Sequence, residues 1–161
     1  MKKQNFIFIL LVSAVLIVIL SCKKDNQDQV KEKDPFNLDV TLNGSGTMNG
    51  SITFRQDPDT TRIITLDTKL EQLQSNHEYL LQRAVDTQID GNCTGTMWLT
   101  LGKGLTPRSI FTNPYGKGSE ELWRDVSMIP AGTVFDIHFR VVDAANNAVV
   151  LTSGCYQYTV R

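Results

Sequence analysis

The sequence contains few of the residues that enzymes and nucleic-acid-binding proteins commonly use. Only two histidines and three cysteines occur in 161 residues, and Lys+Arg 16 against Asp+Glu 17 leave a formal net charge of −1. Because this balance offers no excess of positive charge to a polyanion, we expect no nucleic-acid partner. Neither a Gly-x-Ser-x-Gly nucleophile motif nor a phosphate-binding P-loop is present. Their absence argues against the hydrolases and nucleotide-binding enzymes that use them.

A long uncharged hydrophobic run occurs only at the beginning of the chain. Residues 6–20 are almost all Leu, Ile, Val and Phe, and they follow the two positive charges of Lys2 and Lys3. A membrane-spanning helix needs about 20 apolar residues, and this run is shorter. We therefore interpret residues 1–21 as a signal peptide that directs export. The alternative is a short membrane anchor that stays uncleaved.

The end of this run carries a motif that indicates how the exported chain is held. The residues Ile19-Leu20-Ser21-Cys22 are an aliphatic, a variable and a small residue before a cysteine. This order resembles the lipobox of bacterial lipoproteins. The resemblance implies that Cys22 is acylated and becomes the mature N-terminus. Since two or more acyl chains attach a protein stably to a membrane, we expect an anchor in the cell envelope. The expected site is the outer membrane of a Gram-negative bacterium, on its periplasmic side or its surface.

The chain after Cys22 divides into a tether and a domain. Residues 22–34 are dominated by charged and amide side chains, which cannot bury apolar surface, so we expect a flexible tether. Residues 35–161 carry Cys93 and Cys155. An exported domain with two cysteines most simply joins them in one disulfide. The alternative is two separate free thiols.

The pattern of residues 35–161 is typical of an all-β domain. Apolar and polar residues alternate over 36–42 and again over 135–141, and turns rich in Gly, Pro and Asn separate such segments. Residues 97–101 are interpreted as a strand. Residues 122–128 are interpreted as a strand rather than a helix, because Pro130 follows at once. Together these signals predict a single Greek-key β-sandwich of about eight strands.

Two resemblances support a sandwich. Leu73 lies six residues before Tyr79, as in the corner of fibronectin type III and other immunoglobulin-like sandwiches. The resemblance implies that the tyrosine hydroxyl bonds to the backbone upstream. The segments Gly50–Phe54, Asp90–Cys93 and Gly154–Cys155 are similar to the skeleton of copper/zinc superoxide dismutase. That family also links a loop cysteine to one near the last strand.

The superoxide dismutase resemblance does not extend to the metal site. The family uses several histidines, two of them in a His-x-His pattern, whereas this chain has His77-Glu78-Tyr79 and only one other histidine, His138. Copper and zinc together need more imidazole ligands than these. The sequence therefore predicts no copper or zinc site, and each histidine is interpreted as an ordinary strand residue, with His138 on a polar face.

One segment and two tryptophans are further candidates for a ligand site. Asp86–Asn92 has oxygen ligands around a glycine but lacks the spacing and the closing glutamate of a calcium loop, so a polar turn is favoured and calcium stays open. Trp98 and Trp123 could line a ligand patch, but we expect them in the core.

These observations predict no catalytic residue, no metal ligand and no cofactor. The expected function is that of a non-enzymatic envelope lipoprotein, held to the membrane through Cys22, that binds a protein, a glycan or an envelope component through sandwich loops. One alternative is an envelope hydrolase or metal-dependent enzyme with an unrecognised site. Another is a structural subunit of an envelope complex.

Overall fold

The computed structural model describes residues 34–59 and 61–161, and these residues form strands, turns and loops without a helix. The all-β prediction is therefore confirmed. In chain order the strands of this part are β1 (Leu38–Gly44), β2 (Asn49–Gln56), β3 (Ile63–Glu71), β4 (Glu78–Asp86), β5 (Leu99–Thr100), β6 (Gly102–Lys103), β7 (Thr106–Pro107), β8 (Ser109–Phe111), β9 (Gly118–Asp125), β10 (Val134–Asp143), β11 (Val149–Ser153) and β12 (Tyr156–Thr159).

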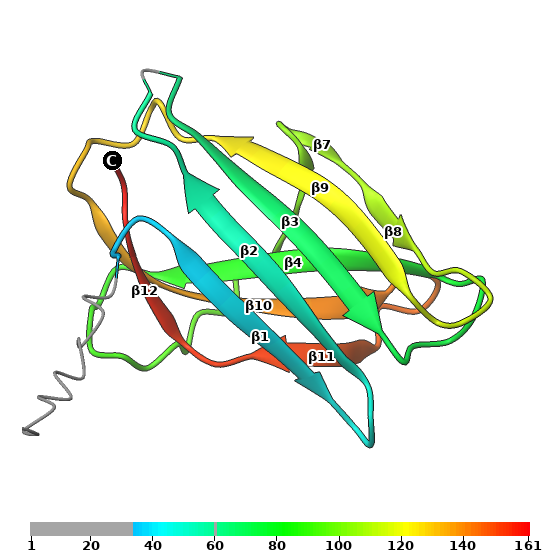
Figure 1. The fold of residues 1–161 in the computed structure, drawn as a ribbon. Coiled ribbons are helices and arrows are strands. Elements are labelled where there is room, and N and C mark those ends of the chain that lie inside the picture. The colour runs from blue at the N-terminus through cyan, green and yellow to red at the C-terminus, as the bar shows by residue number, and fades with distance from the viewer. Residues whose placement is uncertain (1–33, 60) are drawn as a thin grey trace, which may run out of the picture. The chain divides into compact units, whose positions relative to one another are not determined.

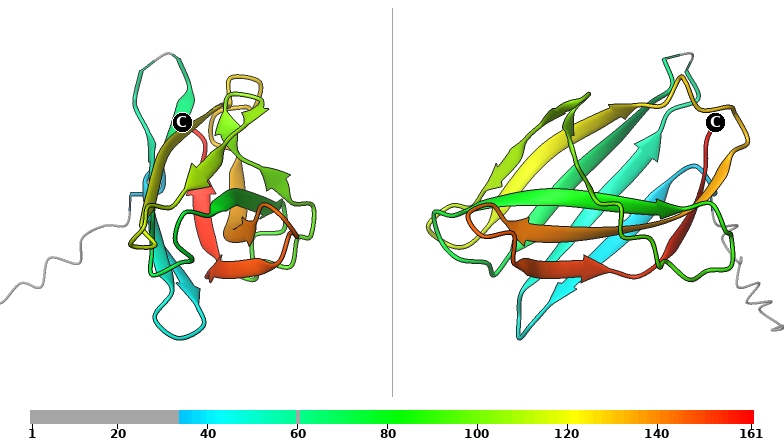
Figure 2. Two further views of the ribbon diagram at one scale, coloured as in Figure 1. Left: turned by 90° about the vertical axis from the view of Figure 1, so that its right-hand side faces the viewer. Right: turned by 180° about the vertical axis from the view of Figure 1, so that it is seen from behind.

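The strands pair into one sheet that folds over on itself. Its order is β5-β4-β10-β11-β1-β2-β3-β9-β6-β7, with β12 paired to β10 and β8 paired to β4. Strands β1, β2, β3 and β9 form one layer, and β4, β10 and β12 cross behind it (Figure 1). Strand β11 joins the layers because it pairs with both β10 and β1. The end-on view in Figure 2 shows the two layers facing each other.

The opposite side of the sandwich is closed by the segment between β4 and β9. Strand β5 pairs with β4, whereas β6, two residues later, pairs with β9. Leu101 lies between these two strands and is buried, and its N–H donates to the carbonyl oxygen of Leu81. The sheet is therefore nearly closed around its interior.

Alternating side chains fill that interior. In β1, Leu38, Val40 and Leu42 are buried, whereas the residues between them are exposed, as the period of two predicts. Aromatic rings join the layers at the centre of the core, where Phe54 lies 4.8 Å from Tyr158, measured between ring centroids. The rings meet edge to face, an arrangement that stabilises beyond the area buried.

Two strand predictions need correction. The segment 97–101 contributes only the two residues of β5, because Met97 is exposed and Gly102 continues into β6 instead of ending the strand. Gly102 is required there by contact, since a Cβ at this position would lie 1.9 Å from the carbonyl oxygen of Thr106. In the segment 122–128 only residues 122–125 belong to a strand, because β9 begins earlier, at Gly118, and ends at Asp125.

Candidate functional site

The structure joins the two cysteines of the domain. The sulfur atoms of Cys93 and Cys155 are bonded at 2.08 Å, and their Cα atoms are 5.3 Å apart. The predicted disulfide is present, and the alternative of two free thiols is wrong. The bond links the loop after β4 to the connection between β11 and β12. Cys22, the predicted signal peptide and all of the predicted tether except Asp34 lie outside the described residues.

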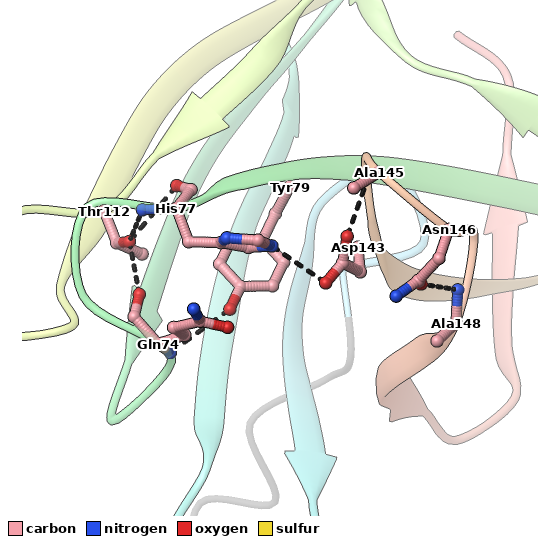
Figure 3. A network of polar contacts seen from close by, with 8 residues as sticks. All are labelled: Gln74, His77, Tyr79, Thr112, Asp143, Ala145, Asn146 and Ala148. Carbon is pink, nitrogen blue, oxygen red and sulfur yellow. Dashed lines mark hydrogen bonds and ion pairs between the residues drawn. The ribbon is translucent and has the colours of Figure 1, made fainter.

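His77 takes part in a polar network at one end of the sandwich (Figure 3). Its Nε2 lies 2.8 Å from a carboxylate oxygen of Asp143 at the end of β10. The N–H of Ala145 donates to the other oxygen of Asp143 at 2.8 Å. This backbone hydrogen bond, followed by the contact with His77, lowers the pKa of the Asp143 carboxyl. The pair therefore ties the start of β4 to the turn between β10 and β11.

Tyr79 and Thr112 complete this network. The Tyr79 hydroxyl accepts a hydrogen bond from the N–H of Gln74 at 3.1 Å, so the upstream backbone contact implied by the tyrosine-corner resemblance is present. Burial raises the pKa of Tyr79. The Thr112 hydroxyl donates to the carbonyl of Gln74 at 2.6 Å and accepts from the N–H of His77 at 3.0 Å. No hydroxyl of the residues drawn in Figure 3 is bonded to the imidazole, which leaves His77 without an activated nucleophile there.

His138 lies on the outer side of β10 under the loop that carries Cys93. Its Nε2 is 3.0 Å from the carbonyl oxygen of Gly95, and its ring is 4.6 Å from the ring of Trp98. The Arg140 guanidinium lies 4.1 Å from the centre of the Trp98 ring. The indole of Trp98 therefore packs against two side chains of β10. The prediction of a core position is wrong for Trp98, which is only half-buried.

The prediction is also wrong for Trp123. Its side chain is half-buried, and a Cβ added to Gly104 would lie 2.8 Å from the indole ring. The indole therefore packs against the turn between β6 and β7. Neither tryptophan belongs to the buried core, because both lie at positions covered by loops and turns rather than by the facing layer.

Asp136, which precedes His138 by two residues in β10, is fully buried. One of its oxygens accepts hydrogen bonds from the N–H groups of Asp90 and Gly91, at 3.0 and 2.8 Å. In the same loop Asp86 accepts from the N–H groups of Thr94 and Gly95. The acids around the calcium-like segment thus hold the backbone of a turn. Within residues 34–59 and 61–161, no three His, Cys, Asp or Glu side chains gather as a metal site.

A cavity of about 230 Å³ lies between the two layers and is partly open to solvent. Apolar side chains from both layers line most of it, among them Phe54 and Leu66 on one side and Val85 and Ile137 on the other. Val126 and Ile129, from the connection between β9 and β10, also contribute to its lining. Concave apolar sites with a few polar groups are typical of ligand binding.

Two arginines are the charged residues of this cavity, and the described side chains that line it include no carboxylate. Arg83 comes from β4 and Arg124 from β9. Burial lowers the pKa of Arg83, and the positive charge of Arg124 lowers it further. The Arg83 guanidinium nevertheless stays charged near neutral pH. Arg124 donates to the carbonyl oxygen of Gly104 at 3.2 Å, and no described side chain pairs with Arg83.

Sequence reasoning missed Arg83 and Arg124, although the sequence contains a signal for both. Tyr79 and Leu81 are buried on one face of β4, and Arg83 lies on that face two residues further on. Arg124 follows the buried Leu122 by the same spacing. A charge on the apolar face of a strand breaks the binary pattern, and such breaks concentrate at functional sites.

No protein family, curated protein or solved structure was found to match this chain. Among residues 34–59 and 61–161 there is no helix long and apolar enough to span a membrane.

Proposed function

We propose that this chain is a lipid-anchored protein of the cell envelope whose β-sandwich binds a small ligand without catalysing a reaction on it. The anchor is supported by the resemblance of residues 19–22 to a lipobox. It agrees with the disulfide between Cys93 and Cys155, since such bonds persist in exported proteins.

The observation that carries the binding function is the cavity between the layers. Its volume of about 230 Å³ exceeds the roughly 150 Å³ of an apolar cavity that admits benzene. The connection between β9 and β10 contributes to its lining, so a loop of the sandwich borders the proposed binding site.

Cell fractionation tests the anchor. Wild-type protein is expected in the membrane fraction at its processed size. The Cys22→Ala variant is expected either unprocessed or released, because no lipid can be attached. Ser21→Ala keeps a small residue before the cysteine and serves as the matched control, expected in the membrane at the processed size. Cys22→Ala protein found in the membrane at the processed size would refute the anchor.

Ligand-observed NMR with toluene tests the cavity, since this neutral molecule is small enough to enter. Saturation transfer to toluene is expected with the wild type and is expected to fall with Val126→Phe, which fills the cavity. Val149→Phe is the matched control, because Val149 is 48% exposed and does not line the cavity. Equal transfer to toluene in all three proteins would refute binding in this cavity.

A further inference from the structure

Two positive charges face an interior that is otherwise almost entirely apolar. Arg83 shares its strand face with the buried Tyr79 and Leu81, and Arg124 shares its face with the buried Leu122. The two arginines come from opposite layers of the sandwich, yet both line the same cavity. Placing guanidinium groups there departs from the rule that inward strand positions are apolar.

The described side chains that line the cavity carry positive charge without any compensating negative charge. A desolvated charge is costly unless it is paired, and two like charges close together add repulsion. The described side chains that line the cavity supply no negative charge to either arginine. The lowered pKa of Arg83 has these two causes, burial and Arg124. An anion bound between the guanidinium groups would relieve both, through charge-assisted hydrogen bonds.

We infer that the cavity binds a small amphiphilic anion, with its carboxylate or phosphate held by Arg83 and Arg124 and its apolar part against Phe54, Val85 and Ile137. This inference rests on the proposed function, since it names the ligand class of the same cavity. With each methylene group taken as about one water volume of ~30 Å³, 230 Å³ holds roughly eight such groups. A medium-chain acid or its phosphate counterpart fits this size.

A purely structural role for the arginines predicts a different result. Arginine can pack its aliphatic stem on apolar surface while its guanidinium reaches water. In that case an anionic ligand would bind no more tightly than a neutral ligand with the same chain. The comparison of anionic, neutral and cationic molecules with the same chain therefore separates the two explanations.

Isothermal titration calorimetry provides this comparison. The purified mature chain is held in zwitterionic nanodiscs, and empty nanodiscs serve as the blank. The probes are octanoate, octyl phosphate, octanol and octylamine. Both anions are expected to bind at least about tenfold more tightly than octanol, and octylamine is expected not to bind, given the strength of hydrogen bonds between charged groups. Tighter binding of octanoate indicates a free acid as the source. Tighter binding of octyl phosphate indicates a lipid-type phosphate.

Variants locate the anion. Arg83→Gln and Arg124→Gln are each expected to weaken octanoate binding about tenfold or more while octanol binding changes little. Arg108→Gln is the matched control, because Arg108 is exposed and does not line the cavity. Thermal unfolding identifies any variant that fails to fold. If Arg83→Gln fails to fold, Arg83→Lys is used in its place. Arg83→Lys is expected to weaken octanoate binding because lysine lacks the planar guanidinium fork.

Three outcomes would overturn the inference. If octanol binds as tightly as octanoate, the cavity binds ligands without selecting anions, and the proposed function stands alone. If the arginine variants bind octanoate as the wild type does, the anion lies elsewhere. If octanoate, octanol and toluene all fail to bind, the proposed function fails together with the inference.

Discussion

Tyr79 shows what one hydroxyl contributes to this fold. The side chain is 3% exposed, and its oxygen accepts the N–H of Gln74. Replacing Tyr79 with Phe removes the acceptor and leaves that N–H without its partner. We expect Tyr79→Phe to lower the free energy of unfolding by about 1–2 kcal/mol, measured by urea denaturation. Tyr115→Phe is the control, because Tyr115 is 81% exposed and should change nothing. Equal stability of Tyr79→Phe and wild type would contradict the role of this bond.

Asp143 makes the stability of the fold depend on pH in the acid range. Its folded-state pKa is lowered, chiefly by the N–H of Ala145 and also by His77, so the folded protein favours the ionised carboxylate. The resulting stability is present above the ordinary aspartate pKa of about 3.9 and is lost as the pH falls through the lower folded value. We expect Asp143→Asn to be less stable than wild type at pH 6, with the difference shrinking towards pH 2 in urea titrations. Glu121→Gln, on an exposed position, serves as the control. A difference that is constant with pH would contradict this origin.

At the scale of strands, the sequence predicts those elements whose alternation reflects one buried face. The segments 36–42 and 135–141 lie largely within β1 and β10 for this reason. Prediction from the sequence fails between β4 and β9. There the short strands β5 and β6 form because of the distant strands beside them, β4 and β9. Gly102 follows the segment 97–101 that the sequence predicts as a strand, but it is in close contact with Thr106, which no local pattern reveals.

The turn between β6 and β7 permits a test at this scale. Gly104 has φ of 66°, and an added Cβ would lie 2.8 Å from the ring of Trp123. Gly46 has φ of 62° in the turn after β1, with nothing within 4 Å of such a Cβ. Gly46→Ala should therefore cost only the backbone strain of about 1–2 kcal/mol. Gly104→Ala should cost about 1–3 kcal/mol more, because the indole must move, and should shift tryptophan fluorescence. Equal losses of stability in the two variants would show that the turn does not pack on Trp123.

For the whole molecule, the sequence predicts the covalent link better than the candidate site. Two cysteines in a domain that is expected to be exported leave one intramolecular pairing, so Cys93 and Cys155 could be assigned by counting. The cavity could not be found this way, because Arg83 and Arg124 are 41 residues apart by their numbering and meet only when the two layers face each other. A charge on an apolar strand face distinguishes each arginine in the sequence, but it does not show that both line the same cavity.

The disulfide is expected to stabilise the fold as a whole. It joins residues separated by 62 positions, and the chain-entropy estimate for a loop of this length is about 4 kcal/mol. We expect the double variant Cys93→Ala/Cys155→Ala to unfold at lower urea concentration, with a loss of about 2–4 kcal/mol. Reduced wild-type protein should match the double variant, which separates loss of the bond from loss of the side chains. The bond also fixes the chain just before β12, whose Tyr158 lines the cavity. Octanoate binding should therefore weaken on reduction before global unfolding, and binding unchanged by reduction would show that the cavity keeps its shape without this link.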